Sequence, residues 1–351
     1  MEITGTLQRQ AWLDRDVPPV EQLRPDLWSI PLPMPNDSLR YITVYALVGD
    51  AGITLIDAGW NGDMAWTALQ DGLAGIGASV SDVKGCLVTH QHFDHIGLAG
   101  RLREAAGAWI GLHPADRDAL VNPTFRNPPQ AEAFDRRWLT SMGAPGDEVD
   151  RLLAMRANPD VRSTIALPDR LIEDGADLRL PGWRLRAVHT PGHTPGHLCF
   201  ADQRTDLLFG GDHLLPRISP NVSDYRDSDH DALGDFLGSL DKVREYDAAE
   251  VLPAHEWRYR GVAGRVHQLE EHHRARLEEL LAVVRRHPDS VAWDLAGELS
   301  WSRPWDQYDG FIRLSAVGET TAHLIHLARQ GRVVVSGSAV PRYSAAPAQH
   351  V

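Results

Sequence analysis

The sequence predicts a mixed α/β fold that is followed by a helical C-terminal region. Short apolar runs rich in β-branched residues alternate with helical stretches up to about residue 258. Beyond about Gly264, apolar residues fall mostly at helical spacing. A chain of 351 residues is also long enough for two domains of about 150 residues each. We therefore expect an α/β domain at residues 1–264 and a smaller domain at residues 265–351.

The composition is that of a folded chain with an acidic surface. Apolar residues make up 43% and charged residues 24%, and 48 acidic residues outnumber 35 Lys and Arg, for a formal net charge of −13. This charge repels phosphate backbones and anionic lipid, so nucleic-acid and membrane partners are disfavoured. The longest apolar runs are also far shorter than the roughly 20 residues that a membrane-spanning helix needs.

The N-terminus and the two cysteines favour a cytoplasmic protein. Residues 1–5 lack the basic start and the apolar stretch of a secretion signal. Cys86 and Cys199 both lie in apolar runs. Two buried thiols in a reducing compartment account for this placement better than a disulfide does.

The N-terminal half predicts strands and helices in alternation. Residues 41–48 and 53–57 flank the turn Gly49-Asp50-Ala51-Gly52 and predict a β-hairpin. Gly107 is expected to cap the end of a helix. The other expected elements of this half are a helix at 63–76, a buried strand at 86–89, a helix at 96–106 and a strand at 109–112.

The C-terminal half predicts more strands and then three helices. The strand-like runs are at 184–188, 198–201, 207–209 and 250–253, with a helix at 230–246. Two further helices follow Gly264, and a third runs through Leu324 to Gly331. Residues 332–337 then predict the start of a small hairpin. Three helices followed by a hairpin form a winged-helix-like pattern.

The segment Thr89-His90-Gln91-His92-Phe93-Asp94-His95 carries the strongest chemical signal in the chain. It joins a predicted strand to a predicted helix, a place where a sheet presents side chains to a cleft. Three imidazoles and a carboxylate are crowded into six positions, and burying them without a bound cation would carry a large desolvation cost. His90 and His92 can point one way while Asp94 and His95 reach a second point, which suits two metal ions about 3.5–4 Å apart.

Three later residues complete a candidate ligand set. His193 lies in a Gly/Pro-rich loop, residues 190–197, between two predicted strands, whereas Asp212 and His255 each follow a strand-like run. Each alone is a weak signal. Together with the first segment they supply five His and two Asp, enough for two divalent metal ions and a bridging carboxylate.

On these residues the sequence resembles the metallo-β-lactamase superfamily over about residues 26–258. The family pattern His-x-His-x-Asp-His stands here at residues 90–95, and an early acidic motif stands as Leu55-Ile56-Asp57-Ala58-Gly59. The resemblance implies an αββα sandwich with the metals at one edge and Asp57 in an outer position that orients a ligand. It implies a first metal on His90, His92 and His193, a second on Asp94, His95 and His255, and Asp212 between the two.

Departures from the family pattern narrow the expected substrate. The commonest subclass of true β-lactamases places a Cys where this chain has Asp212, and neither cysteine stands at a ligand position. The ligand set is similar to the glyoxalase II, lactonase and thioesterase branch. The C-terminal region resembles the winged-helix-like domain of the β-lactamase-like-protein-2 and polyketide thioesterase group, which includes an RNA-cleaving member.

We therefore expect a dinuclear metal-dependent hydrolase that cleaves an acyl thioester or a related ester or lactone through a metal-bound hydroxide. The substrate would be a small molecule or carrier-bound. Zinc suits the His-rich set, and iron or manganese would also be accepted. Asp94 and Asp212 are the expected catalytic residues. The alternatives are a metal-dependent phosphodiesterase or ribonuclease, and a non-catalytic binding protein.

Other polar residues receive weaker interpretations. His197 is expected to support the site from an outer position rather than to bind metal. Arg258 and Arg260 follow His255 and could hold a substrate carboxylate or phosphate; the competing interpretation is a pair of solvated surface arginines.

Residues 115–170 interrupt the family pattern with an insertion of helical tendency, about 55 residues long. Its aromatic and Met side chains suit an adaptable apolar pocket. We expect a lid over the metal cleft in which Trp138 and Phe134 grip an acyl tail. In the alternative account the same side chains pack against the sandwich, or against a second subunit in a homodimer.

Overall fold

The computed structural model describes residues 1–35, 39–155, 165–224, 230–247 and 249–347. These residues divide into two compact units. The first unit consists of Met1–Asn122, Val161–Pro220 and Ser239–Val266. The second consists of Pro123–Asp160, Asn221–Gly238 and His267–Val351. The second unit thus includes two segments that the expected division at residues 264 and 265 gives to the first domain.

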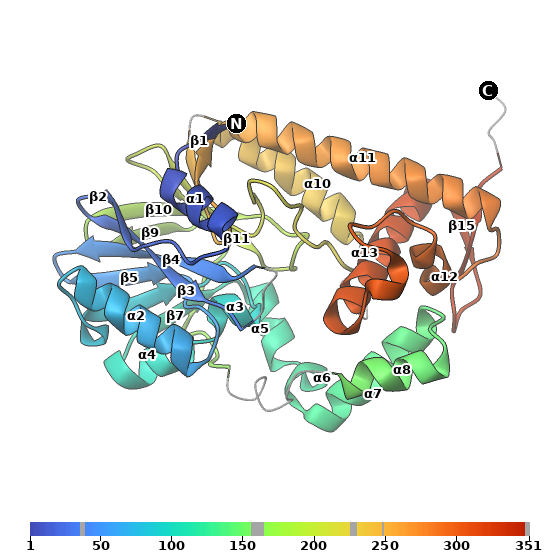
Figure 1. Ribbon diagram of the computed structural model, residues 1–351, viewed down its shortest axis with the longest axis horizontal. Helices are drawn as coiled ribbons and strands as arrows, with labels where there is room; N and C mark the ends of the chain where they lie inside the picture. The colour runs from blue at the N-terminus through green and yellow to red at the C-terminus, as the bar shows by residue number, and fades with distance from the viewer. Residues whose placement is uncertain (36–38, 156–164, 225–229, 248, 348–351) are drawn as a thin grey trace. The chain divides into compact units, whose positions relative to one another are not determined.

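The first unit contains two seven-stranded sheets (Figure 1). In one of them the strand order is β2-β3-β4-β5-β6-β7-β8, antiparallel from β2 to β5 and parallel from β5 to β8. The expected hairpin is confirmed, since Gly49 pairs with Gly52. The strands are β2 (Glu21–Arg24), β3 (Leu27–Pro33), β4 (Tyr41–Gly49), β5 (Gly52–Ile56), β6 (Val83–Leu87), β7 (Trp109–Leu112) and β8 (Arg170–Leu171).

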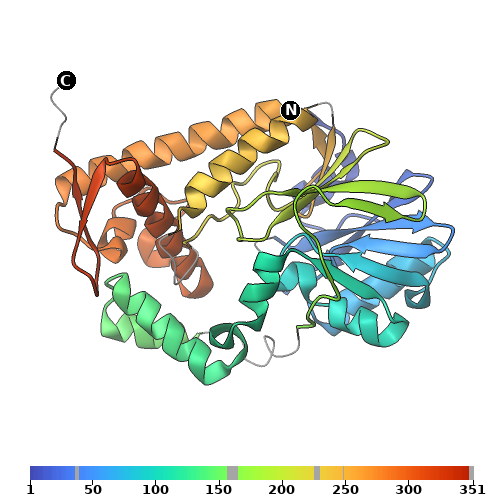
Figure 2. The same cartoon turned by 180° about the vertical axis from the view of Figure 1, so that it is seen from behind.

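The other sheet has the order β1-β14-β13-β12-β11-β10-β9 and is antiparallel except between β12 and β13. Figure 2 shows several of its strands from behind. Its strands are β1 (Glu2–Ile3), β9 (Asp177–Leu180), β10 (Trp183–His189), β11 (Leu198–Asp202), β12 (Leu207–Gly211), β13 (Glu250–Pro253) and β14 (Tyr259–Arg260).

One hydrophobic core joins the inner faces of the two sheets. Leu27 and Tyr45 from the first sheet belong to the same buried cluster as Leu185, Phe200 and Phe209 from the second. The rings of Tyr45 and Phe209 meet edge to face, with their centroids 5.5 Å apart. The sandwich predicted from the family resemblance is therefore confirmed.

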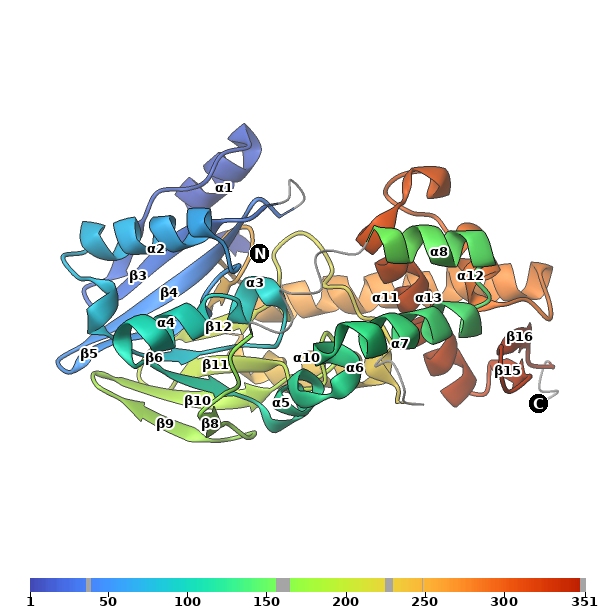
Figure 3. The same cartoon turned by 90° about the horizontal axis from the view of Figure 1, so that it is seen from below.

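Helices α2 (Asp63–Gly75) and α4 (Ala99–Ala106) lie along the outer face of the β2–β8 sheet, as Figure 3 shows. A further helix, α1 (Thr6–Asp14), follows the first strand. Gly107 ends α4 in the left-handed conformation with φ 67°, which confirms the predicted cap. The strand predicted at 86–89 ends earlier, at Leu87. The Val88 amide still donates to Gly111 of β7, and from Thr89 on the chain leaves the sheet, since the Thr89 amide donates to the Asp57 side chain.

The second unit is mainly helical. The inserted segment begins with α5 (Pro114–Val121) of the first unit and continues in the second. Helix α10 begins in the second unit and ends in the first, and helix α11 begins in the first and ends in the second. The helices and strands of the second unit are α6 (Pro123–Arg126), α7 (Pro128–Ser141), α8 (Gly146–Ala154), α10 (Ala232–Val243), α11 (Val262–Arg286), α12 (Ala292–Gly297), α13 (Gly310–Arg329), β15 (Val333–Ser336) and β16 (Arg342–Ala345).

Three helices and then an antiparallel hairpin follow one another at the C-terminus, in the order that the sequence predicts. Their identity as a winged helix stays a prediction. Among the described residues, no helix combines the length and the apolar character that crossing a membrane requires.

Candidate metal centre

The structure brings together all seven residues that the sequence predicts as metal ligands. Each lies beyond the carboxyl end of a strand, either in a loop or in a short helix. His90 and His92 follow β6, and Asp94 and His95 lie in the short helix α3 (Phe93–Ile96). The other three are His193 between β10 and β11, Asp212 after β12, and His255 after β13.

The first group of candidate ligands consists of His90, His92 and His193, which have one ligand atom each within 4.8 Å of the others. His90 Nε2 lies 2.9 Å from His92 Nδ1. The His92 and His193 rings are nearly perpendicular, with their centroids 4.6 Å apart. Three imidazoles converging in this way could hold one metal ion.

The second group consists of Asp94, His95 and His255, again with ligand atoms within 4.8 Å of one another. Asp94 Oδ2 lies 3.3 Å from His255 Nε2 and 3.7 Å from His95 Nε2. This group corresponds to the second metal site that the family resemblance implies.

Asp212 directs its two carboxylate oxygens at different groups. Its Oδ2 lies 3.5 Å from His193 Nε2 of the first group. Its Oδ1 lies 3.4 Å from His95 Nε2 and 3.5 Å from His255 Nε2 of the second. A carboxylate placed in this way could contact an ion in each group at once.

The donor atoms fit divalent cations. His95 Nε2, His255 Nε2 and Asp212 Oδ1 are buried and make no hydrogen bond with any described residue. Burying polar atoms without partners is costly, so each such atom suggests a ligand. The separations of 3.3–3.5 Å also agree with about 3.3 Å expected between two ligands that lie roughly 2.0–2.1 Å from one tetrahedral ion.

Outer hydrogen bonds fix the orientation of the second group. His95 Nδ1 lies 2.8 Å from Asp57 Oδ2, and His255 Nδ1 lies 3.0 Å from the carbonyl oxygen of Tyr41. When both rings donate from Nδ1, their Nε2 atoms present lone pairs toward the centre. Asp57 also accepts from the amide and hydroxyl of Thr89 and adopts a positive φ of 62°, a conformation uncommon for a residue with a side chain.

His197 supports Asp212 through the backbone. The Asp212 amide donates to His197 Nε2 at 3.1 Å, and His197 Nδ1 lies 2.8 Å from the hydroxyl oxygen of Thr190. The neighbouring Gly211 has φ 50°, and a Cβ there would come within 2.6 Å of His197 Nε2. Only glycine therefore allows this approach of Asp212 to His197.

Charge and burial set the protonation of the site. Burial lowers the pKa of His90 well below its usual range and that of His92 to about 3, so both imidazoles are neutral. Burial acts in the same direction on His95, but the neighbouring carboxylates, Asp57 foremost, outweigh it and raise its pKa. Burial would raise the pKa of Asp94, but the adjacent imidazoles lower it to about 2. A divalent cation would replace the protons shared within this group, since ligands bind metal in their deprotonated form.

Two sequence-predicted substrate contacts have carboxylate partners instead. Arg258 is buried, and its guanidinium donates to Glu250 and to Glu21 at 2.8 Å each. Arg260 lies 3.8 Å from Glu250, and its backbone stands opposite that of Glu2 in the pairing of β14 with β1. The burial of Arg258 contradicts the competing interpretation of a solvated surface arginine, and its two carboxylate partners leave its guanidinium already engaged. A substrate contact of Arg260 stays a prediction.

Phe134 and Trp138, the other two predicted substrate contacts, are buried. The Trp138 indole donates to Asp224 Oδ2 at 2.9 Å, a contact within the second unit. Met142, one turn further on, accepts a hydrogen bond from Thr321 of the same unit. These contacts show where part of the insertion packs, whereas its predicted role as a lid stays a prediction.

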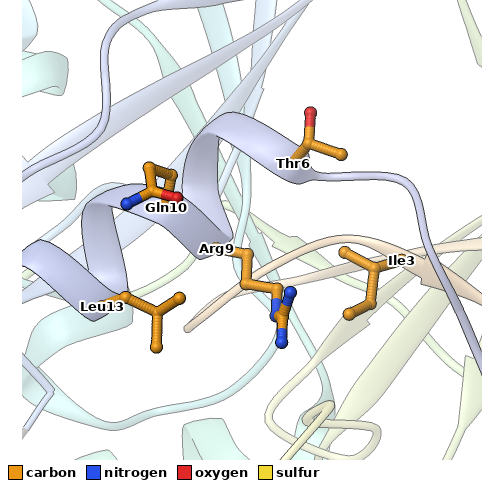
Figure 4. A pocket seen from close by; sticks show the side chains of 5 residues that line it. All are labelled: Ile3, Thr6, Arg9, Gln10 and Leu13. Carbon is orange, nitrogen blue, oxygen red and sulfur yellow. The ribbon is translucent and has the colours of Figure 1, made fainter.

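A small pocket of about 200 Å³ at the N-terminus contains none of the predicted site residues. Ile3, Arg9 and Leu13 extend toward the same side of α1 in Figure 4. Its lining of Ile3, Thr6, Arg9, Gln10 and Leu13 offers no carboxylate, imidazole or thiol for a metal ion.

Asp116 is a site residue that our sequence analysis missed. It lies just beyond β7, and its carboxylate accepts hydrogen bonds from two of the ligand-bearing loops. Its place four residues after the strand predicted at 109–112 is a weak signal, because nothing in the sequence identifies the backbone amides from which it accepts.

The sequence model of the metallo-beta-lactamase superfamily matches residues 38–255, a range that includes all seven candidate ligands. The chain belongs to the metallo-beta-lactamase superfamily. A superfamily member of known structure from Thermus thermophilus has 32% identity and a TM-score of 0.78, covering 92% of this chain and 100% of that one. A beta-lactamase domain protein from Burkholderia ambifaria has 25% identity and a TM-score of 0.76, covering 99% of this chain and 100% of that one.

Relatives within the superfamily carry hydrolase names. Probable metallo-hydrolase YqjP of Bacillus subtilis (strain 168) is 27% identical over 75% of this chain and 82% of its own. Hydroxyacylglutathione hydrolase GloC of Haemophilus influenzae is 31% identical over 38% of this chain and 51% of its own. Atrochrysone carboxyl ACP thioesterase AgnL7 of Paecilomyces divaricatus is 37% identical over 29% and 31%. The expected class, a metal-dependent hydrolase of the metallo-beta-lactamase superfamily, is confirmed.

Proposed function

We propose that this chain is a dinuclear metallohydrolase that cleaves an acyl thioester or a related ester or lactone. The observation that carries the proposal is the placement of Asp212 between two groups of three ligands, with one oxygen toward each group. The expected ions are zinc, with iron or manganese as alternatives.

In the proposed centre, His90, His92 and His193 would hold one ion, Asp94, His95 and His255 the other, and Asp212 both. Two divalent cations supply a hydroxide nucleophile at neutral pH and polarise the carbonyl of the substrate. Asp57 and the Tyr41 carbonyl keep the His95 and His255 rings oriented, and His197 holds the backbone of Asp212.

Asp94 would orient the attacking water. Its side chain is 15% exposed, against 0% for His95 and His255, so water can reach this carboxylate within the second group. A carboxylate accepts a hydrogen bond from water and so fixes the direction of its lone pair. No thiolate is required: burial raises the pKa of Cys199 to about 12 and that of Cys86 well above its usual range.

The names of two relatives support an acyl thioester as the substrate. One is named an ACP thioesterase and another a hydroxyacylglutathione hydrolase. The first name supports a carrier-bound substrate and the second a small-molecule one. The formal net charge of −13 disfavours the polyanionic substrate of a ribonuclease.

A substrate panel tests the proposal. The metal-loaded chain is assayed on a chromogenic acyl thioester, a lactone and bis(p-nitrophenyl) phosphate, with Asp212→Ala as the control. We expect turnover of the thioester or lactone, its loss on chelation and its return on adding Zn²⁺. Cleavage of the phosphodiester alone would replace the proposal with the phosphodiesterase alternative, and no turnover of any substrate would leave the non-catalytic one.

A further inference from the structure

Asp116 is a fully buried carboxylate outside the set of seven ligands. It lies in the first turn of α5 and is 0% exposed. Its Oδ2 accepts from the Gln91 amide and the Thr194 hydroxyl, both at 2.9 Å, and its Oδ1 accepts from the Gly196 amide at 2.7 Å. Three donors offset much of the cost of burying a carboxylate.

All three donors belong to the two loops that carry the first group of ligands. Gln91 stands between His90 and His92, and Thr194 directly follows His193. The Asp116 carboxylate therefore ties the turn after β6, in one sheet, to the loop between β10 and β11, in the other.

The second group has a different carboxylate behind it. Asp57 accepts from His95 and from the amide of Thr89. Asp57 thus contacts a ligand of the second group directly, and it reaches the first group only through Thr89, whose Oγ1 lies 3.1 Å from His90 Nδ1. Asp116 accepts from the loops of the first group.

The packing at Gly196 is a separate observation that supports this arrangement. A Cβ at Gly196 would lie 2.7 Å from both Cγ and Oδ1 of Asp116 and 2.6 Å from its amide nitrogen. Gly196 does not have a positive φ, so the requirement is for space and not for an unusual backbone conformation. The absence of a side chain lets the loop approach the carboxylate closely.

We infer that Asp116 is a positioning residue that holds the His90–His92 turn and the His193 loop at the separation needed by one of two metal ions. The inference rests on the proposed metal centre and assigns Asp116 to the first ion only. Asp116→Asn keeps the size of the side chain but places an amide NH₂ against at least one N–H or O–H donor. The first group should therefore lose preorganisation, while the second group keeps its own partners.

Variants with a single ligand group provide the test. His255→Ala disables the second group and His92→Ala the first, and Asp116→Asn and Asp57→Asn are introduced into each background. Zn²⁺ affinity is measured by competition with a chromophoric chelator, independently of any substrate. We expect Asp116→Asn to weaken binding about 10–100-fold in the His255→Ala background and less than about threefold in the His92→Ala background. Asp57→Asn should weaken binding in the His92→Ala background, because Asp57 contacts His95 directly.

Equal effects of Asp116→Asn in both backgrounds, or none in either, would overturn the inference. If the chain without any substitution binds no Zn²⁺, both the proposed function and the inference about Asp116 fail. If that chain binds two ions and Asp116→Asn leaves the affinity unchanged, only the inference about Asp116 fails. Should Asp116→Asn not fold, Thr194→Val removes one donor with little change in shape. It should then weaken the first site by about 3–10-fold, and an unchanged affinity would overturn the inference equally.

Discussion

Asp212 differs from the other candidate ligands in that each of its carboxylate oxygens faces a different group. Asp57 and His197 act one step away, through His95 and through the Asp212 amide. Replacing Asp57 or His197 by Ala should reduce kcat/KM by about 10–100-fold, a range typical of residues that support ligands. Asp212→Ala should cost more than either, because it removes a contact to both ions.

Steady-state kinetics of the three variants at saturating Zn²⁺ tests this ranking. His267→Ala, on the solvent-exposed side of α11, serves as the control and should retain full kcat/KM. Equal losses in the Asp212, Asp57 and His197 variants would contradict a bridging role for Asp212.

The sequence predicted the seven candidate ligands because packing alone rarely brings so many imidazoles and carboxylates to the ends of strands. It did not predict Asp116, because two of the three donors to that carboxylate are backbone amides, those of Gln91 and Gly196. Backbone donors leave no side-chain pattern to detect. For Arg258 the sequence lacked the information that Glu21, more than 200 positions away, lies beside it.

At the scale of elements, the inserted helix α7 carries the side chains that we predicted to grip substrate. Trp138 is 6% and Phe134 7% exposed, and Trp138 is hydrogen-bonded to Asp224. Burial of this degree favours a role in holding the second unit together. Trp138→Ala should then reduce the free energy of unfolding by about 3–5 kcal/mol.

Kinetics and denaturation of Trp138→Ala distinguish a structural role from a role as a substrate lid. Trp138→Phe is the matched control, because it loses the hydrogen bond but keeps an aromatic ring. We expect similar losses on short and long acyl chains, in step with the fall in Tm. A rise in KM confined to long-chain substrates, at unchanged Tm, would instead support the lid.

Helices α11 and α13 carry a buried histidine pair that should make stability depend on pH. His273 Nδ1 lies 3.2 Å from His323 Nε2, and burial lowers the pKa of His323 to about 4. In the unfolded chain His323 binds a proton near pH 6.5, whereas in the folded chain it stays neutral down to about pH 4. The stability that neutral His323 allows above pH 6.5 is therefore lost as the pH falls toward 4. Between pH 7 and pH 5, His323 alone should account for a loss of about 2 kcal/mol.

Urea unfolding at pH 7 and pH 5 measures this effect. His323→Gln keeps hydrogen-bonding groups but does not titrate, so its loss of stability between the two values should be smaller by about 2 kcal/mol. An identical pH dependence in both proteins would show that His323 is not the group responsible.

At the scale of the whole molecule, the alternation of strands and helices predicted a mixed α/β fold, and the family resemblance implied the sandwich. The solved structure from Thermus thermophilus shares the fold over 92% of this chain. The division into units was harder to predict. Residues 123–160 and 221–238 belong with the C-terminal helices through contacts such as Trp138 with Asp224 and Met142 with Thr321. A local apolar pattern shows that a helix has a buried face but not which distant segment covers it.

The central claim is a centre for two metal ions, and elemental analysis of the purified 351-residue chain tests it most directly. After reconstitution with Zn²⁺ and removal of free metal, the account predicts about two ions per chain, falling to about one in His92→Ala and to about one in His255→Ala. A metal-to-protein ratio near zero, or a ratio that neither substitution lowers, would contradict it.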